Sequence, residues 1–365
     1  MPVNPQDVIK ALSSVRDPDL NRDIVSLGFV RDLEVGDHRV SFTIHFPTPV
    51  STIKQQLGAT AKHAVEALGV ADVQVRVTSA AGAGTSAGTM PGAMPAAGPK
   101  HNLIPQVKNT IAVASGKGGV GKSTVAANLA VALSLTGAKV GLMDTDVYGP
   151  SVPMLMGGHE APHVVEGKLE PPVEYGIKII SMAYFLPKDE AVIWRGPMLH
   201  KTINQFLGEV RWGALDYLLM DMPPGTGDIQ LSLSQTIPLT GAVIVSTPQD
   251  LALTVASKAI AMFQKLRVPI LGLVENMSYY ICPKCGHREG IFGHGGARAA
   301  AGQMGFPFLG EIPLDMFIRT SSDSGKPVAL DATTPQGRAF QEIARAVVEQ
   351  VNVANSLAAQ EISIE

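Results

Sequence analysis

The sequence predicts an α/β protein in which a small α/β domain precedes a larger domain with a mainly parallel, doubly wound sheet. Short, continuous apolar runs alternate with helical segments over the second two thirds of the chain, as in strands buried on both faces. The first part instead alternates apolar and polar residues, and a stretch of small residues separates the two patterns. We therefore predict domains at 1–78 and 102–355, a linker at 79–101 and a C-terminal tail at 356–365.

The small domain shows two helical and three strand patterns. Apolar residues recur at helical spacing over 7–14 and 51–68, and Gly69 ends the second helix. Strands are expected at 30–35, 39–45 and 73–78, and Gly36-Asp37 is typical of a hairpin turn between the first two.

The linker is a low-complexity segment. Residues 79–99 are wholly Ala, Gly, Ser, Thr, Pro and Met, without a periodic apolar face. Repeated Gly and Pro argue against the alternative of an alanine-rich helix, so we expect a flexible tether.

The larger domain alternates strand and helix patterns. Strands are expected at 111–114, 140–143, 217–220, 243–245 and 270–274. Helices are expected at 124–136, 251–266, 297–304 and 335–353. This order predicts the doubly wound fold.

Composition excludes several classes of function. Of 365 residues, 45% are hydrophobic and 17% charged, which is typical of globular proteins, and the net charge of −3 gives no support to nucleic-acid binding. Neither a signal peptide nor a membrane-spanning apolar run is visible, so we expect a cytoplasmic protein that does not bind membranes. The two cysteines, Cys282 and Cys285, are too few for a disulfide framework, and their close spacing points to a metal-binding or redox pair.

A phosphate-binding loop follows the first strand of the larger domain. Residues 115–124 read SGKGGVGKST and contain the pattern G-x-x-x-x-G-K-[ST] between a strand and a helix. Its glycines let backbone N–H groups converge on phosphate, the lysine reaches the β- and γ-phosphates, and the serine hydroxyl meets Mg²⁺. The expected ATP-binding residues are Gly116, Lys117, Gly118, Gly119, Val120, Gly121, Lys122, Ser123 and Thr124. A glycine-rich turn that binds nothing is the alternative.

Lys117 is a second lysine within this loop. The segment resembles the deviant Walker A family, which includes MinD, ParA, ArsA and the nitrogenase iron protein. The resemblance implies that Lys117 reaches the nucleotide of a partner subunit and takes part in catalysis, so ATP would gate a homodimer. The alternative is a solvated lysine without a role.

Three carboxylates end strands of the predicted sheet and should face its ligand crevice: Asp144, Asp146 and Asp221. Asp221 fits the Walker B role of holding Mg²⁺. The resemblance implies that Asp146 positions the attacking water, that Asp144 lines the Mg²⁺ site and that Asn276 contacts adenine. The loop at 221–228 resembles the family's switch II. Each aspartate could instead be only a helix cap or a turn residue.

The cysteine pair has four interpretations. A cubane iron–sulfur cluster wants four thiolates, and a symmetric dimer would supply them from Cys282 and Cys285 of each chain. Two chains could equally share a structural zinc ion. One chain could bind zinc with its two cysteines, His287 and His294, although the Cys285–His287 spacing is tight for a zinc finger. The pair could also be a redox Cys-x-x-Cys, although such a motif normally lies at the N-terminus of a helix.

Several longer motifs narrow the resemblance. These are 146–151 (DVYGPS), 194–197 (WRGP), 221–228 (DMPPGTGD), 282–286 (CPKCG) and 292–296 (FGHGG). Over about 102–353 the chain resembles the Mrp/ApbC family of iron–sulfur cluster carrier ATPases. The resemblance implies a homodimer that binds ATP, Mg²⁺ and a [4Fe–4S] cluster and transfers the cluster to apo-proteins. The alternatives are a MinD/ParA-like positioning ATPase with a Cys₄ zinc site, and an electron donor of the nitrogenase iron-protein type.

The small domain resembles one found in iron–sulfur assembly factors and often fused to this ATPase. The resemblance rests on 16–19 (RDPD), 23–28 (DIVSLG) and 47–49 (PTP). Val50 and Ser51 stand where that domain often has a cysteine, so the resemblance does not extend to a thiol-based role. We expect the domain to dock a client protein or an assembly scaffold.

Overall fold

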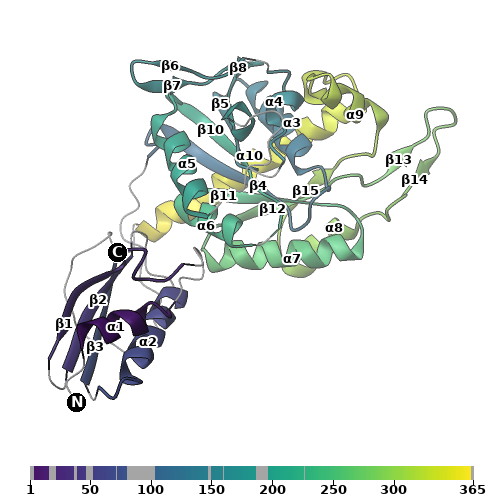
Figure 1. Ribbon diagram of the computed structural model, residues 1–365. Coiled ribbons are helices and arrows are strands. Elements are labelled where there is room, and N and C mark those ends of the chain that lie inside the picture. The colour runs from purple at the N-terminus through teal and green to yellow at the C-terminus, as the bar shows by residue number, and fades with distance from the viewer. Residues whose placement is uncertain are drawn as a thin grey trace. The chain divides into compact units, whose positions relative to one another are not determined.

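The computed structural model describes residues 4–15, 22–36, 39–46, 52–70, 72–79, 103–146, 149–158, 160–185, 196–225 and 227–362. The chain forms two compact units, Met1–Pro95 and Ala96–Glu365, and the division falls within the predicted linker (Figure 1). The linker at 80–101, the motif at 16–19 and the segments 47–51, 147–148 and 194–195 lie outside the described residues. Their predicted roles stay predictions.

The first unit is a three-stranded sheet packed against two helices. Its elements are α1 (Pro5–Leu12), β1 (Val30–Val35), β2 (Arg39–Phe46), α2 (Thr52–Glu66) and β3 (Asp72–Ser79). Strand β2 is central, antiparallel to β1 and parallel to β3, and α2 makes the crossover between the parallel pair. Alternate residues of β2, Val40, Phe42 and Ile44, are buried in the core, as the alternating pattern predicts.

The second unit contains an eight-stranded sheet in the order β15-β12-β11-β4-β10-β5-β9-β8. All neighbours pair in parallel except β8 and β9, so the predicted doubly wound, mainly parallel sheet is confirmed. The strands are β4 (Val107–Ala114), β5 (Val140–Asp144), β8 (Val173–Glu174), β9 (Ile177–Ser181), β10 (Leu215–Asp221), β11 (Gly241–Ser246), β12 (Ile270–Glu275) and β15 (Phe308–Glu311).

Helices cover both faces of this sheet (Figure 1). They are α3 (Lys122–Ser134), α4 (Val152–Leu155), α5 (Gly196–Glu209), α6 (Asp228–Thr236), α7 (Asp250–Lys265), α8 (Gly296–Met304), α9 (Met316–Asp323) and α10 (Pro335–Ile362). In β4, Ile111 and Val113 pack in a core with α3 and α10, whereas Ala112 and Ala114 pack in a second core with α5 and α7. Burial on both faces explains why the strand reads as one apolar run.

The structure adds elements that the sequence analysis did not predict. Two short hairpins are formed by β6 (His163–Val165) with β7 (Lys168–Glu170), and by β13 (Tyr280–Ile281) with β14 (Arg288–Glu289). Two 3₁₀ turns lie at Met182–Phe185 and Val328–Leu330. Helix α10 continues to Ile362, through most of the segment predicted as a tail.

The fold places the sequence motifs at one edge of the sheet. Asp221 at the end of β10 lies in register with Val113 of β4 and with Asp144 of β5. The carboxyl ends of these strands therefore meet where the phosphate-binding loop leaves β4, as expected for a parallel sheet. Over the described residues, no helix is long and apolar enough to cross a membrane.

Candidate nucleotide and cysteine sites

The predicted phosphate-binding loop joins β4 to α3 and packs against α7 and against Asn276, which follows β12. Gly121, the residue before α3, has φ of 78°, in the left-handed region that favours glycine. A Cβ on Gly121 would lie 2.2 Å from Nδ2 of Asn276, and one on Gly116 would lie 2.3 Å from the Val255 carbonyl oxygen of α7. The glycines are thus required for close packing as well as for the turn.

The first turn of α3 has features of an anion-binding helix N-terminus. No side chain caps it and no acidic residue occupies its first turn. Of the predicted loop residues, Lys117, Gly118 and Gly119 are exposed, Gly121, Ser123 and Thr124 are half-buried, and Gly116, Val120 and Lys122 are buried. Backbone N–H groups of the loop and helix can therefore face a phosphate.

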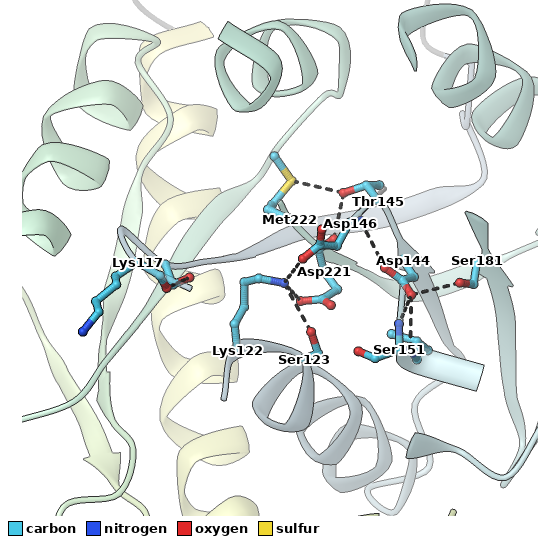
Figure 2. Close-up of polar contacts among 12 residues, drawn as sticks. Lys117, Lys122, Ser123, Asp144, Thr145, Asp146, Ser151, Ser181, Asp221 and Met222 are labelled. Atoms are coloured by element: carbon cyan, nitrogen blue, oxygen red, sulfur yellow. Dashed lines mark hydrogen bonds and ion pairs between the residues drawn. The ribbon is translucent and has the colours of Figure 1, made fainter. Parts of the chain in front are cut away.

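Lys122 lies in a buried ionic cluster with two of the predicted aspartates (Figure 2). Its Nζ lies 2.5 Å from Oδ1 of Asp221, 3.7 Å from Oδ2 of Asp146 and 3.4 Å from the Ser123 hydroxyl. Burial raises the pKa of Asp221, and the neighbouring Lys122 ammonium opposes that rise. The structure thus brings together four predicted residues from the loop, β10 and the end of β5.

One oxygen of this cluster fits a metal ion. Asp221 is fully buried, and its Oδ2 has no hydrogen-bond partner among the described residues. A buried carboxylate oxygen without a partner is costly, and carboxylate and hydroxyl oxygens are ligands that Mg²⁺ takes in phosphate sites. Asp221 and Ser123 are therefore a donor set that suits Mg²⁺.

Asp144 makes a different set of contacts from those of Asp221. Its Oδ2 accepts hydrogen bonds from the backbone N–H groups of Ser151 and Val152 and from the Ser181 hydroxyl, at 2.9–3.1 Å. Its Oδ1 accepts one from the Asp146 N–H at 3.1 Å. Burial and the nearby Asp221 charge raise the pKa of Asp144 to about 7. Asp144 fixes the loop after β5, and its role at a Mg²⁺ site stays a prediction.

Lys117 and Asn276 differ in their exposure to solvent. Figure 2 shows the Lys117 side chain pointing away from Lys122 and the carboxylates, and the residue is exposed. Asn276 is buried, and its amide donates to the Val120 carbonyl oxygen at 2.8 Å. Asn276 therefore supports the loop in this structure, and its predicted contact with adenine is untested.

The cysteine pair lies in the connection between β13 and β14, a hairpin that projects from the domain (Figure 1). Both thiols are free; Cys282 is half-buried and Cys285 is exposed. The turn is closed by hydrogen bonds from Cys282 N to His287 O and from Gly286 N to Cys282 O, each 2.9 Å. The backbone N–H groups of Cys285 and Lys284, then the Cys285 thiol, lower the pKa of Cys282. This turn therefore favours a thiolate, the form that binds metals.

The hairpin geometry disfavours two of the alternatives, a zinc site within one chain and a redox cysteine pair. His287 pairs with Glu289 at 3.0 Å, and His294 with Ser278 at 3.0 Å. Among the described residues, the cysteines do not belong to a cluster of three or more metal-ligating side chains within one chain. The pair also lies in a turn and not at a helix N-terminus, which disfavours a thioredoxin-type redox site.

A polar network at the base of the hairpin was missed by the sequence analysis. It consists of Glu275, Ser278, Arg288, His294 and Glu311. Glu275 ends β12 as Asp221 ends β10, so the rule that selected the aspartates could have found it. His294 lies in the 292–296 motif, whereas Ser278, Arg288 and Glu311 carry no motif.

Comparisons with known proteins match each unit to a family of iron–sulfur proteins. Residues 106–348 match a family described as NUBPL iron-transfer P-loop NTPase, and residues 5–77 match an iron–sulfur cluster assembly protein family. An iron–sulfur cluster carrier protein of Deinococcus radiodurans is 45% identical over 350 residues, covering 95% of both chains. One of Synechocystis is 42% identical over 355 residues, covering 95% of this chain and 98% of its own.

A solved structure resembles the second unit. It is a nucleotide-binding protein of Archaeoglobus fulgidus in complex with ADP, 41% identical, with a TM-score of 0.59. The match covers 66% of this chain and 96% of that protein.

Proposed function

The chain belongs to the NUBPL iron-transfer P-loop NTPase family, and we propose that it is an ATPase that carries a [4Fe–4S] cluster between two copies of itself. It would deliver the cluster to apo-proteins. The observation that carries this proposal is the exposed turn at Cys282 and Cys285, whose backbone N–H groups favour a thiolate.

The number of thiols supports a shared site. Each chain has two cysteines, whereas a cubane cluster is held by four thiolates. Two projecting hairpins related by a two-fold axis would supply all four. A cluster held at hairpin tips is accessible to an acceptor, which suits transfer better than permanent retention.

The nucleotide site would work through the residues already described. Lys122 and the loop N–H groups would hold the phosphates, and Asp221 with Ser123 would hold Mg²⁺, which neutralises charge on the phosphates when bound. Asp146, 3.7 Å from Lys122, would orient the attacking water. The exposed Lys117 would reach the partner's nucleotide, so that hydrolysis depends on dimerisation.

The first unit would provide the docking surface for a client or a scaffold. Its match to an iron–sulfur cluster assembly family supports this role. A flexible linker over 79–101 and a cytoplasmic location belong to the same proposal.

Anaerobic reconstitution tests the function directly. We expect the protein to acquire the visible absorbance of a [4Fe–4S] cluster, with equal iron and acid-labile sulfide, and to activate an apo-acceptor. Tightly bound zinc in protein purified without oxygen, with no cluster after reconstitution, would instead support the structural zinc site.

A further inference from the structure

The turn at 275–278, which begins at the last residue of β12, contacts the phosphate-binding loop and the base of the cysteine hairpin. Asn276 points to the phosphate-binding loop, where its amide donates to the Val120 carbonyl oxygen at 2.8 Å. The same amide fills the space beside Gly121, and the Met277 side chain reaches the same glycine. A change in the loop backbone at Val120 or Gly121 therefore displaces a direct contact with this turn.

The neighbouring residue, Glu275, faces the cysteine hairpin. It is fully buried, and its two carboxylate oxygens accept hydrogen bonds from the Gly295 N–H at 2.9 Å and from the Ala297 N–H at 2.6 Å. Oε1 also accepts from the Ser278 hydroxyl at 2.6 Å. Glu275 thus fixes the chain that returns from the hairpin to α8.

Ser278 extends this network to His294, which follows the hairpin, and to Glu311, which pairs with Arg288 of β14. With its proton directed to Glu275, its oxygen can accept from Nδ1 of His294 at 3.0 Å. Arg288 of β14 pairs with Glu311 at 2.9 Å, and its guanidinium lies 3.6 Å from the ring centroid of Tyr279, the residue before β13. The hairpin base is therefore held by an ion pair, hydrogen bonds and a cation–π contact.

The backbone of the turn is constrained. Met277 has φ of 55°, a left-handed conformation that is strained for a non-glycine residue. Asn276 N donates to the Ser246 carbonyl oxygen at 2.8 Å and Ser278 N to that of Ile312 at 2.9 Å, so both flanks are tied to neighbouring strands. A turn fixed in this way transmits a displacement from one side to the other.

Glu275, His294 and Glu311 also bring three ligand atoms within 4.8 Å of one another, as a metal site would. Their existing partners explain the cluster better. Both oxygens of Glu275 accept from backbone N–H groups, and Arg288 supplies the positive charge beside Glu311. The cluster is a closed network of protein groups.

We infer that the turn at 275–278 couples nucleotide binding to the cysteine hairpin, with Asn276 as the contact to the loop and Glu275 and Ser278 as positioning residues. The inference rests on the proposed function, because it assigns a purpose to communication between an ATP site and a cluster site. This coupling is distinct from one that passes through the loop after Asp221, because the contacts of Glu275, Asn276 and Ser278 given above involve no residue of β10.

Alkylation of the metal-free protein tests the inference without a cluster. Cys282 and Cys285 are the only thiols of the chain, so iodoacetamide labelling reports on the hairpin alone. In the wild type, saturating ATP with Mg²⁺ should change the labelling rate about fivefold or more, the lower end of ordinary coupling between sites. Ser278→Ala should reduce this change to less than about twofold, with the nucleotide again at saturation.

Two further variants sharpen the test. Glu275→Gln removes the charge but keeps the shape, and we expect the same loss of response. Ser356→Ala removes an exposed serine of α10 that bonds only within its helix, and its response should match the wild type. The inference is overturned if the wild type shows no nucleotide response, or if Ser278→Ala and Glu275→Gln respond as the wild type does. A protein that binds no cluster but keeps the response would contradict the proposed function and leave the coupling intact.

Discussion

Nζ of Lys122 and Oδ1 of Asp221 lie 2.5 Å apart, although 99 residues separate them in the chain. The lysine belongs to the first turn of α3 and the aspartate ends β10, so the pair ties the phosphate-binding loop to the strand that leads into the 221–228 loop. A phosphate that binds Lys122 must compete with this carboxylate. Nucleotide binding at Lys122 would therefore act on the end of β10 through one buried ion pair.

Lys122→Met should abolish nucleotide binding and also destabilise the fold. Because Asp221 is fully buried, removing its partner leaves an uncompensated charge, which costs about 3–5 kcal/mol. Adding Asp221→Asn should recover most of that loss without restoring binding. Urea unfolding and nucleotide titration measure the two effects, and equal stability of the single and double variants would contradict the ion-pair argument.

Asp221→Asn should lower Mg²⁺-dependent ATP hydrolysis by about 100-fold or more and change ATP affinity much less. Its unpartnered Oδ2 is the oxygen best placed for the metal, whose charge matters most in the transition state. Steady-state hydrolysis and equilibrium binding give the two values. A loss of binding as large as the loss of hydrolysis would mean that Asp221 acts mainly by placing Lys122.

Lys117→Ala should keep ATP binding and lose hydrolysis, by about 10³-fold if the lysine acts on the partner's nucleotide as an arginine finger does. The exposed side chain makes no contact with Lys122 in Figure 2, so the fold should be unaffected. Lys168→Ala, another exposed lysine, is the control. Mixing Lys117→Ala chains with Asp221→Asn chains tests action across subunits. Hydrolysis should return in the mixed dimer only if the lysine acts on the partner's nucleotide, because one site then has both an intact Asp221 and an intact lysine.

Cys282→Ala and Cys285→Ala should each remove the cluster. With two thiolates per chain, reconstituted wild type should hold about two iron atoms per chain, and either change deletes two of four ligands in the dimer. ATP binding should remain, because both cysteines lie in the β13–β14 turn and not among the predicted ATP-binding residues. A full cluster per monomer, or one that persists in Cys285→Ala, would exclude the shared site.

Asp144 should give a pH dependence to the stability of the metal-free protein. Its pKa is raised from 3.8 to about 7 in the fold, so the native state binds the extra proton between these values. Stability from this group is therefore present below about pH 4 and is lost as the pH rises to about 7. Urea unfolding of Asp144→Asn should show a smaller decline over this range, and parallel curves for variant and wild type would contradict the shift.

The sequence predicted the elements of the first unit and the five adjacent strands β12, β11, β4, β10 and β5 of the large sheet, because these strands have clear periodicity. It did not predict the outer strands β15, β9 and β8 or the helices α5, α6 and α9. β1 has the predicted bounds, and the predicted strands of the second unit all occur, since burial on both faces gives uninterrupted apolar runs. The hairpin β6–β7 was not predicted, because residues such as Val164, 69% exposed, follow no burial period. Short edge hairpins are determined by their surroundings more than by their own residues.

Some contacts at the candidate sites could be predicted from the sequence and others could not. The spacing of the loop and the strand-end position of Asp221 predicted that they meet, because parallel strands end at a common edge. No local pattern predicts that Asn276 supports Val120, or that Glu275 joins residues 295–297, because both contacts depend on how the turn after β12 is folded.

The exposed cysteine turn also has a consequence for metal competition in the cell. The two sulfur ligands lie in a projecting turn, with Cys285 exposed, and thiolates bind copper(I) strongly. We expect a copper load to displace iron here before it reaches enclosed clusters. Growth that depends on newly assembled iron–sulfur enzymes would then fail first, while the ATPase itself stays intact.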